Sequence, residues 1–429
     1  MSSPASRAET GLPGAATEPH SALPVFLCFA FAYFFSALVR AVVATLAPVF
    51  SADLGLTAAD LGLLAGAYFL GFAAMQLPLG SALDRLGPKR VLLGFLSLAV
   101  IGCMLFALAR SFVGLTAARA LIGMGVGACL MAPMTFYRRR FSPTAQMRAA
   151  SWMLMTGSSG MVASTLPVQW LLPLLGWRGL FWLLAGLFLL SMVAIAGFVP
   201  RDDAAEPHTL RAADPAAGGY REVFRHPTFI RLMPMGFFHF GGLLALQSLW
   251  IGPWLSRVCG WMPQQAAQGL FALNVGMLLT FLGWGAVLPR LYARGWTAQS
   301  LIARGLPLSL VVLVLAVALG EKATAAAWTL FCVGSTLVSL AQPAIGQSFP
   351  SALAGRALSA YNLVIFAGVF ALQWMIGVTI DLLGAAGWST ASAFQGAFAL
   401  LALSCIASYL WFLWFDDCDC PAPATGTAA

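Results

Sequence analysis

The stretch GSALDRLGPKR, residues 80–90, lies between two long apolar runs, residues 58–83 and 90–109. Glycine lets helices approach each other closely in a membrane, and it also allows tight turns. We therefore expect Gly80 to lie where two helices meet and Gly87 to form the turn between the two runs. This arrangement predicts a helix, a short polar loop and a second helix.

The charged residues of this stretch also have a physical role. Asp84 ends the first run, where its carboxylate can cap the N-terminus of a neighbouring helix or pair with a basic residue. Cations beside an apolar run hold a loop on the cytoplasmic side of a membrane. The cations of this loop are Arg85, Lys89 and Arg90.

The composition of the whole chain indicates a membrane protein. Of its 429 residues, 60% are hydrophobic and 9% are charged, whereas about a quarter of the residues in a soluble domain are charged. A membrane-spanning helix needs about 20 apolar residues. We predict an all-α membrane protein with twelve transmembrane helices in two pseudo-symmetric bundles of six. The expected spans are residues 23–50, 58–83, 90–109, 113–137, 148–174, 179–199, 229–256, 264–289, 299–319, 324–350, 357–383 and 389–415.

The longest polar interval divides these spans into two groups of six. We expect a six-helix bundle at residues 22–199, a cytoplasmic linker at 200–228 and a second bundle at 229–415. Residues 1–21 and 416–429 are expected to be disordered tails.

The distribution of Lys and Arg predicts the orientation. With the N-terminus inside, the cytoplasmic segments hold 17 of the 23 basic residues and the outer loops hold four. Cytoplasmic loops of membrane proteins are enriched in these residues. We therefore expect a multi-pass protein of the inner (plasma) membrane with both termini in the cytoplasm. The same bias explains the net charge of +8 without nucleic acid.

The 80–90 stretch resembles the signature loop of the major facilitator superfamily, G-x-x-x-D-R-x-G-x-[KR]-[KR]. Residues Arg119–Gly127 resemble the family's R-x-x-x-G-x-G-x-G pattern, and Gly176–Arg178 resemble its G-W-R turn. The resemblance implies secondary transport of a small solute by alternating access, with the 80–90 loop holding the two halves together in the outward-facing state. It also implies a coupling or gating role for Arg119, which lies near the outer end of its span; the alternative is an arginine that snorkels to the membrane surface.

A weaker copy of the loop occupies the matching place in the second half, at Gly285–Gly295. Pro289 stands there in place of the aspartate. Such a copy is what duplication of a six-helix unit would leave.

Arg40 is the leading candidate for substrate binding. It lies 17 residues after Leu23, roughly 25 Å along a helix at about 1.5 Å per residue, past the middle of the membrane. Tyr33 and Ser36 share its helical face. A buried arginine suits a carboxylate or phosphate, while the alternative is an arginine held by helix-end carbonyls or reaching the outer interface.

The second half offers no matching arginine. If Pro48 corresponds to Pro253, Arg40 corresponds to Ala245. Gln247 and Trp250 are the nearby substitutes, and a pair of arginines gripping one phosphate is absent. We therefore expect a singly charged or partly apolar anion.

Other polar side chains lie at middle depth, where they are costly unless used. Among them, we assign Asn274, Tyr361 and Asn362 to the substrate site. Each could instead tie helices together. The remaining amides of this kind are Gln76, Gln342 and Gln373.

None of the 15 acidic residues lies in the middle of an expected span. Proton-coupled carriers often use a carboxylate at that depth. We therefore favour antiport, facilitated movement, or proton symport in which the substrate or His239 carries the proton. The alternative for His239 is a structural role in a hydrogen bond.

Several other functions stay open. Paired sulfur and imidazole ligands, Met131 with Met134 and Met235 with His239, would suit a copper importer, and Cys418 and Cys420 stand in the C-terminal tail. Methionine is also an ordinary filler of apolar helices. A drug efflux pump of the same fold and a transporter-like sensor are further alternatives.

The sequence predicts no enzyme, because it contains no nucleophile–base set and no phosphate-binding loop. We expect no cofactor, no resident metal and no nucleic acid. The expected partners are a small-molecule substrate, a coupling proton or counter-substrate, and the lipid bilayer around a monomer.

Overall fold

The computed structural model describes residues 19–200 and 219–415, and these residues form helices and short connections without a strand. The expected tails, apart from residues 19–21, and residues 201–218 of the expected linker lie outside the described residues. The last residues of that linker contain a short helix, α8 (Tyr220–Arg225).

The first half consists of seven helical segments. They are α1 (Pro19–Leu54), α2 (Ala58–Leu86), α3 (Pro88–Leu108), α4 (Phe112–Val126), α5 (Ala128–Arg140), α6 (Pro143–Ala163) and α7 (Leu166–Phe198). α4 and α5 together make one span, Phe112–Arg140.

The second half starts with a long helix that alternates between α-helical and π-helical turns. Its segments are α9 (Pro227–Pro234), η1 (Met235–Phe240), α10 (Gly241–Ala245), η2 (Leu246–Trp250), α11 (Ile251–Pro253) and η3 (Trp254–Val258). The segments that follow are α12 (Pro263–Ala293), α13 (Ala298–Leu319), η4 (Gly320–Lys322), α14 (Ala325–Ser335), η5 (Thr336–Leu340), α15 (Ala341–Ser348), α16 (Ser351–Ala385) and α17 (Thr390–Trp414).

Eleven helices of the described chain are long and apolar enough to cross a membrane, and α6 is not one of them. α7, however, contains two helices joined at Gly176, where φ is +63°. α6 with the part of α7 before Gly176 corresponds to the fifth expected span, and the remainder of α7 to the sixth. The helical fold is therefore as predicted, with the fifth span interrupted at Ser164 and Thr165.

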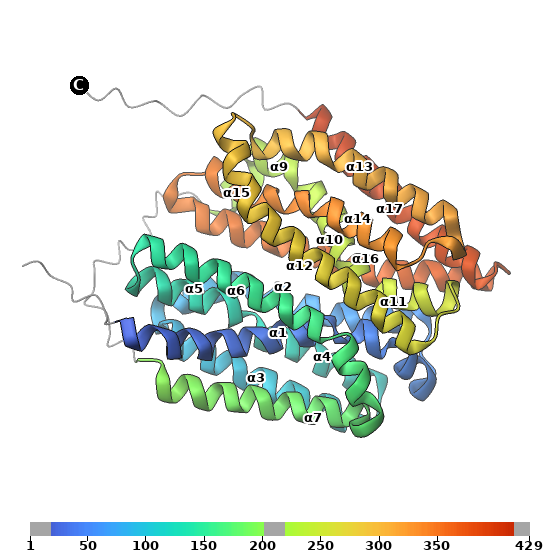
Figure 1. The fold of residues 1–429 in the computed structure, drawn as a ribbon, viewed down its shortest axis with the longest axis horizontal. Coiled ribbons are helices and arrows are strands. Elements are labelled where there is room, and N and C mark those ends of the chain that lie inside the picture. The colour runs from blue at the N-terminus through green and yellow to red at the C-terminus, as the bar shows by residue number, and fades with distance from the viewer. Residues whose placement is uncertain (1–18, 201–218, 416–429) are drawn as a thin grey trace, which may run out of the picture.

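The helices lie in two layers (Figure 1). α1–α7 form the lower layer in this view, and α9–α17 form the upper layer. We call the end with the turns at Gly87 and Phe141 the basic end, on the left in Figure 1, and the end with the turns at Gly55 and Gly260 the far end.

Glycines bring α2 and α4 into backbone contact. A methyl group built on Gly123 would lie 1.9 Å from the carbonyl oxygen of Tyr68, and one on Gly71 would lie 2.0 Å from that of Ala120. Small residues allow such close packing in membranes, where packing drives helix association. Gly123 of the 119–127 pattern is therefore explained by the close packing of α4 against α2.

The two glycines of the 80–90 loop behave differently from each other. Gly87 has φ +78° between α2 and α3, which confirms the expected turn. The close helix approach expected at Gly80 is absent from this conformation, because no atom of another described segment lies within 4 Å of a methyl group built there. α2 makes its close contacts nearer the far end.

We predict that Gly123→Ala destabilises the protein, because the added methyl group forces α2 and α4 apart. Overpacking of this kind costs about 1–3 kcal/mol. Thermal denaturation in detergent measures the loss, with Gly80→Ala as the matched control in the same half. Equal melting temperatures for the two variants would contradict the packing argument.

Candidate substrate-binding cavity

A cavity of about 600 Å³ lies between the two halves, within the usual range of ligand sites. Both halves contribute to it, through α1, α2, α5, α6, η2, α12, α15 and α16 among others. Arg40 is the one charged side chain among the described residues that line it. The amide side chains of the lining are Gln76, Gln247, Asn274, Gln342 and Asn362.

Arg40 lies on α1 together with Tyr33 and Ser36, and all three line the cavity. The guanidinium interacts with the phenols of Tyr33 and Tyr68, and its Cζ lies 5.8 Å from the ring centroid of Phe72. Arg40 Nε has no hydrogen-bond partner among the described residues. Leaving a buried donor unpaired is costly, so the arginine has unused capacity to bind an anion.

Arg119 is fully buried on α4 beside the same part of α1. Its Nη2 donates to the carbonyl oxygen of Val39 at 2.9 Å and to that of Arg40 at 3.4 Å. Its Cζ also lies 5.0 Å from the ring centroid of Tyr68. Arg119 therefore ties α1 to α4 and fixes the backbone of Arg40, and it is not among the residues that line the cavity. Its expected coupling or gating role stays a prediction.

The second half lines the cavity with two amide pairs. Gln247 Nε2 donates to Asn274 Oδ1 at 3.0 Å, and Asn274 Nδ2 donates to the carbonyl oxygen of Leu270 at 2.9 Å. Gln342 Nε2 donates to Asn362 Oδ1. The structure thus brings three of the predicted contacts of the second half to the cavity.

Trp250 and Tyr361 are placed elsewhere, with fully buried side chains that are not part of the lining. Trp250 Nε1 donates to the backbone carbonyl of Gln373 at 3.1 Å, and Tyr361 Oη donates to the carbonyl oxygen of Leu232 at 3.3 Å. The π-helical turn η2 has more residues per turn than an α-helix. In an α-helix, residues three apart share a face, so the sequence predicts that Trp250 lies beside Gln247. In the π-helical turn Trp250 points away from the cavity that Gln247 lines.

His239 is also fully buried and outside the lining. Its Nε2 lies 3.3 Å from Ser335 Oγ on α14, and its Nδ1 has no partner among the described residues. Gln373 is likewise buried outside the lining and only partly hydrogen-bonded. Its Nε2 donates to Ser248 Oγ at 3.0 Å, and its Oε1 has no partner among the described residues. Both side chains link helices of the second half.

The 80–90 loop joins helices of the first half. Lys89 Nζ donates to the carbonyl oxygens of Ala196 at 2.8 Å and Val199 at 2.5 Å, at the C-terminal end of α7. Arg139 Nη2 donates to the carbonyl oxygen of Leu83 in the last turn of α2. Cations stabilise helix C-termini in this way. The other charged members of the loop, Asp84, Arg85 and Arg90, are exposed.

The proposed copper ligands do not gather at one site. Met131 lines the cavity, whereas Met134 does not, and Met235 is buried beside His239 within the second half. Within the described residues, no group of three or more His, Cys, Asp or Glu side chains could hold a metal ion. Cys418 and Cys420 lie outside the described residues.

The two halves meet directly at the far end. The carboxylate of Asp381, near the end of α16, accepts from the backbone N–H groups of Ala58 at 3.1 Å and Ala59 at 2.7 Å. It thereby caps the N-terminus of α2. Arg257 Nη2 of the second half donates to Ser51 Oγ of the first half at 2.7 Å. Methyl groups built on Gly62 and Gly377 would collide with backbone of the other half.

The cavity lies nearer the basic end. Its lining on α2 begins at Phe72, and its lining on α12 begins at Asn274 and continues to Leu288. No lining residue comes from the stretches of α2 and α16 that meet at the far end, Ala58–Gly71 and Gly368–Ala385. The halves are therefore packed together at the far end and separated from the middle toward the basic end.

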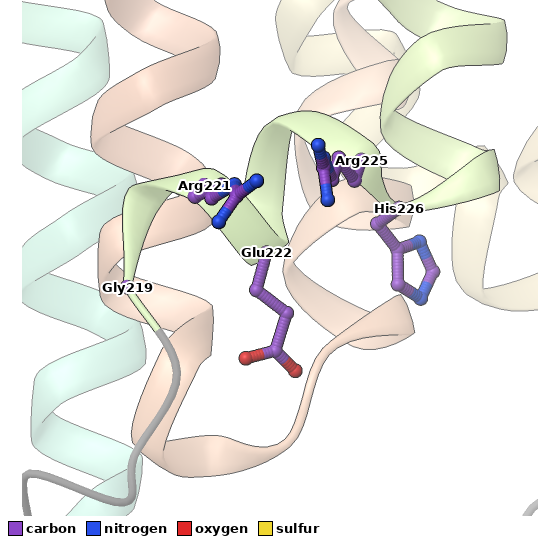
Figure 2. Close-up of a pocket in the computed structure, with 5 residues that line it drawn as sticks. All are labelled: Gly219, Arg221, Glu222, Arg225 and His226. Atoms are coloured by element: carbon purple, nitrogen blue, oxygen red, sulfur yellow. The ribbon is translucent and has the colours of Figure 1, made fainter.

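A second hollow lies beside α8 at the basic end. Figure 2 shows its lining residues, with Glu222 directed away from Arg221 and Arg225. The ring of His226 packs against Phe349, with centroids 4.3 Å apart. Its lining begins at Gly219, the first described residue of the second half, and we assign no function to it.

A sequence model of the Major Facilitator Superfamily matches residues 29–372. The chain belongs to the major facilitator superfamily. The match covers most of both halves, and it confirms the resemblance of the 80–90 loop and of the 119–127 pattern.

Individual relatives of this superfamily member are distant. It is 29% identical to a 3-(3-hydroxy-phenyl)propionate transporter of Escherichia coli K12 over 60% of each chain. It is 26% identical to a "Probable sulfoacetate transporter" of Cupriavidus necator over 64% of this chain and 66% of that one. The chain thus spans less than two thirds of the length of these relatives. They are named as transporters rather than enzymes.

The fold is shared with a solved structure. A bacterial homologue of the human lysosomal transporter Spinster, in an inward-facing and unoccupied conformation, superposes with a TM-score of 0.75 at 18% identity. The superposition covers 93% of this chain and 97% of that one. At this identity the likeness concerns the fold.

We predict that Asp381→Ala lowers the stability of this conformation, because it removes the two hydrogen bonds that the second half makes to the first turn of α2 and leaves only that helix's own capping box at Thr57 and Asp60. Loss of a helix cap costs about 0.5–2 kcal/mol. Thermal denaturation in detergent provides the measurement. Glu321→Ala, which removes an exposed acid at the same end, is the matched control, and a melting temperature of Asp381→Ala equal to that of this control would refute the prediction.

Proposed function

We propose that this protein is a secondary transporter of small organic anions and that Arg40 binds the anionic group. The observation that carries the proposal is the position of Arg40 on the cavity wall with an unpaired Nε and no acidic residue among the described lining. A charge at this depth is costly and is retained where it has a function. The guanidinium fork matches a carboxylate.

The printed names of two relatives support this substrate class. One is named for hydroxyphenylpropionate and the other for sulfoacetate, and both compounds are organic anions. Sulfoacetate carries two acidic groups and hydroxyphenylpropionate carries one. Arg40 is the one cation among the described residues of the lining. This favours a substrate with a single acidic group, as in hydroxyphenylpropionate.

The bias of Lys and Arg supports an inner-membrane protein with the basic end in the cytoplasm. In this orientation the cavity lies toward the cytoplasm, and Asp381 closes the outer side against α2. The 80–90 loop then lies on the cytoplasmic side. Its exposed Asp84 can then bind the second half after the cavity opens outward. Gly80, Arg85 and Gly87 belong to the same loop, which would hold the two halves together in the outward-facing state.

The lining also limits which groups could carry a coupling proton. Since no carboxylate lines the described cavity, a coupling proton would travel on the substrate or on His239. Exchange against a second anion satisfies the same constraint without a protonatable side chain.

We predict that Arg40→Ala reduces uptake of an anionic substrate to background in proteoliposomes, because the anion loses its counter-charge inside the membrane. Arg40→Lys keeps a charge without the bidentate fork and should retain partial uptake. Arg110→Ala, an exposed arginine at the far end, is the matched control. Uptake by folded Arg40→Ala equal to wild type would refute the proposal.

The ligand for this test comes from a thermal-shift screen of the purified protein against carboxylates, phosphates, amino acids and drugs, since a bound ligand stabilises the native state. Stabilisation by an anion without any flux in proteoliposomes would indicate a transporter-like sensor. Stabilisation by lipophilic cations alone would favour a drug efflux pump.

A further inference from the structure

The cavity wall beside Arg40 is aromatic. Arg40 Cζ lies 5.8 Å from the ring centroid of Phe72 on α2. The ring of Phe72 lies 4.5 Å from that of Phe366 on α16, with an angle of 58° between the rings. Both phenylalanines line the cavity. This ring pair crosses from the first half to the second at middle depth.

The next lining group beyond this ring pair is an amide. Asn362 lies one turn before Phe366 on α16, so the two side chains share a face of the helix, and both line the cavity. Asn362 Oδ1 accepts from Gln342 Nε2. Asn362 Nδ2 and Gln342 Oε1 make no hydrogen bond with any described residue, which leaves one donor group and one acceptor for a ligand.

The wall therefore presents three kinds of group in order: a guanidinium, a pair of aromatic rings and a pair of amides. The guanidinium lies 5.8 Å from the first ring, the two rings lie 4.5 Å apart, and the amide lies one helical turn, about 5.4 Å, from the second ring. A single small molecule can contact all three. Its matching parts are an anionic group, a flat apolar body and a polar group at the opposite end.

The charge of the wall limits the ligand further. Arg119, the other arginine within the spans of the first half, donates from Nη2 to α1 carbonyl oxygens and does not line the cavity. A second anionic group on the ligand would meet amides and aromatic rings rather than a cation. Leaving a desolvated carboxylate unpaired is unfavourable, so the wall disfavours dianions.

We propose that the substrates are aromatic monocarboxylates that carry a hydrogen-bonding substituent on the ring, with the carboxylate on Arg40, the ring against Phe72 and Phe366, and the substituent on Asn362 and Gln342. This inference rests on the proposed function of Arg40. It adds that Phe366 and Asn362 determine specificity.

The test compares four acids by thermal shift and by competition for uptake in proteoliposomes. They are phenylpropionate with a ring hydroxyl, phenylpropionate, hexanoate as an aliphatic monoanion, and succinate as a dianion. We expect the hydroxylated acid to bind about tenfold more tightly than phenylpropionate, the effect of one hydrogen bond. Hexanoate should bind more weakly than phenylpropionate, and succinate weakest of all.

Two variants separate the roles of the side chains. Asn362→Leu should make phenylpropionate and its hydroxylated form bind equally, while Gln264→Leu, the same kind of change at an exposed amide of the far end, should keep their ratio. Phe366→Leu should weaken both aromatic acids and leave hexanoate unchanged. A general loss of folding would weaken all ligands alike and is checked by melting temperature.

The outcomes distinguish this inference from the proposed function. If hexanoate or succinate binds as tightly as the aromatic acids and Arg40→Ala abolishes that binding, the aromatic specificity is overturned and anion transport stands. The same holds if Asn362→Leu keeps the preference for the hydroxyl. If Arg40→Ala leaves the binding of every acid unchanged, the proposed function itself is overturned.

Discussion

Hydrocarbon offers no hydrogen bonds, so each polar group within the spans must find a partner inside the protein. Arg119 meets this constraint in part: its Nη2 donates to α1 carbonyl oxygens, while its Nε and Nη1 have no partner among the described residues. Trp250 meets it through the backbone of Gln373. Two amide pairs of the second half, Gln247 with Asn274 and Gln342 with Asn362, supply each other with one hydrogen bond. Arg40 is the charged group that lies at the cavity with donor capacity unused.

This constraint explains how far the sequence could predict the fold. Apolar runs of about 20 residues and the bias of Lys and Arg predict spans without any tertiary information. The turn at Gly87 is likewise local, because only its own backbone requires a positive φ. Gly80 illustrates the limit: a glycine shows that close approach is possible, but its neighbour depends on the conformation of the whole molecule.

The candidate site was less predictable for a related reason. Arg40, Tyr33 and Ser36 lie on a regular α-helix, so their spacing predicts a shared face, and the structure places all three at the cavity. Trp250 lies in a π-helical turn, which the sequence LQSLW does not reveal, and its side chain is buried behind the wall. Phe72 and Phe366 give no signal in the sequence, because apolar aromatic residues are ordinary in membrane helices.

The contact between Asp381 and the first turn of α2 has a consequence for reversibility. The groups it joins are a carboxylate and two amide N–H groups, all of which water solvates well. Parting the halves at this end exchanges protein hydrogen bonds for hydration, and the net free energy of such an exchange is small. The adjoining stretches of α2 and α16 also pack closely at Gly62 and Gly377, and parting them exposes buried area in proportion to its size. The capped helix is thus the part of this contact that separates at little cost in free energy and re-forms once water is excluded.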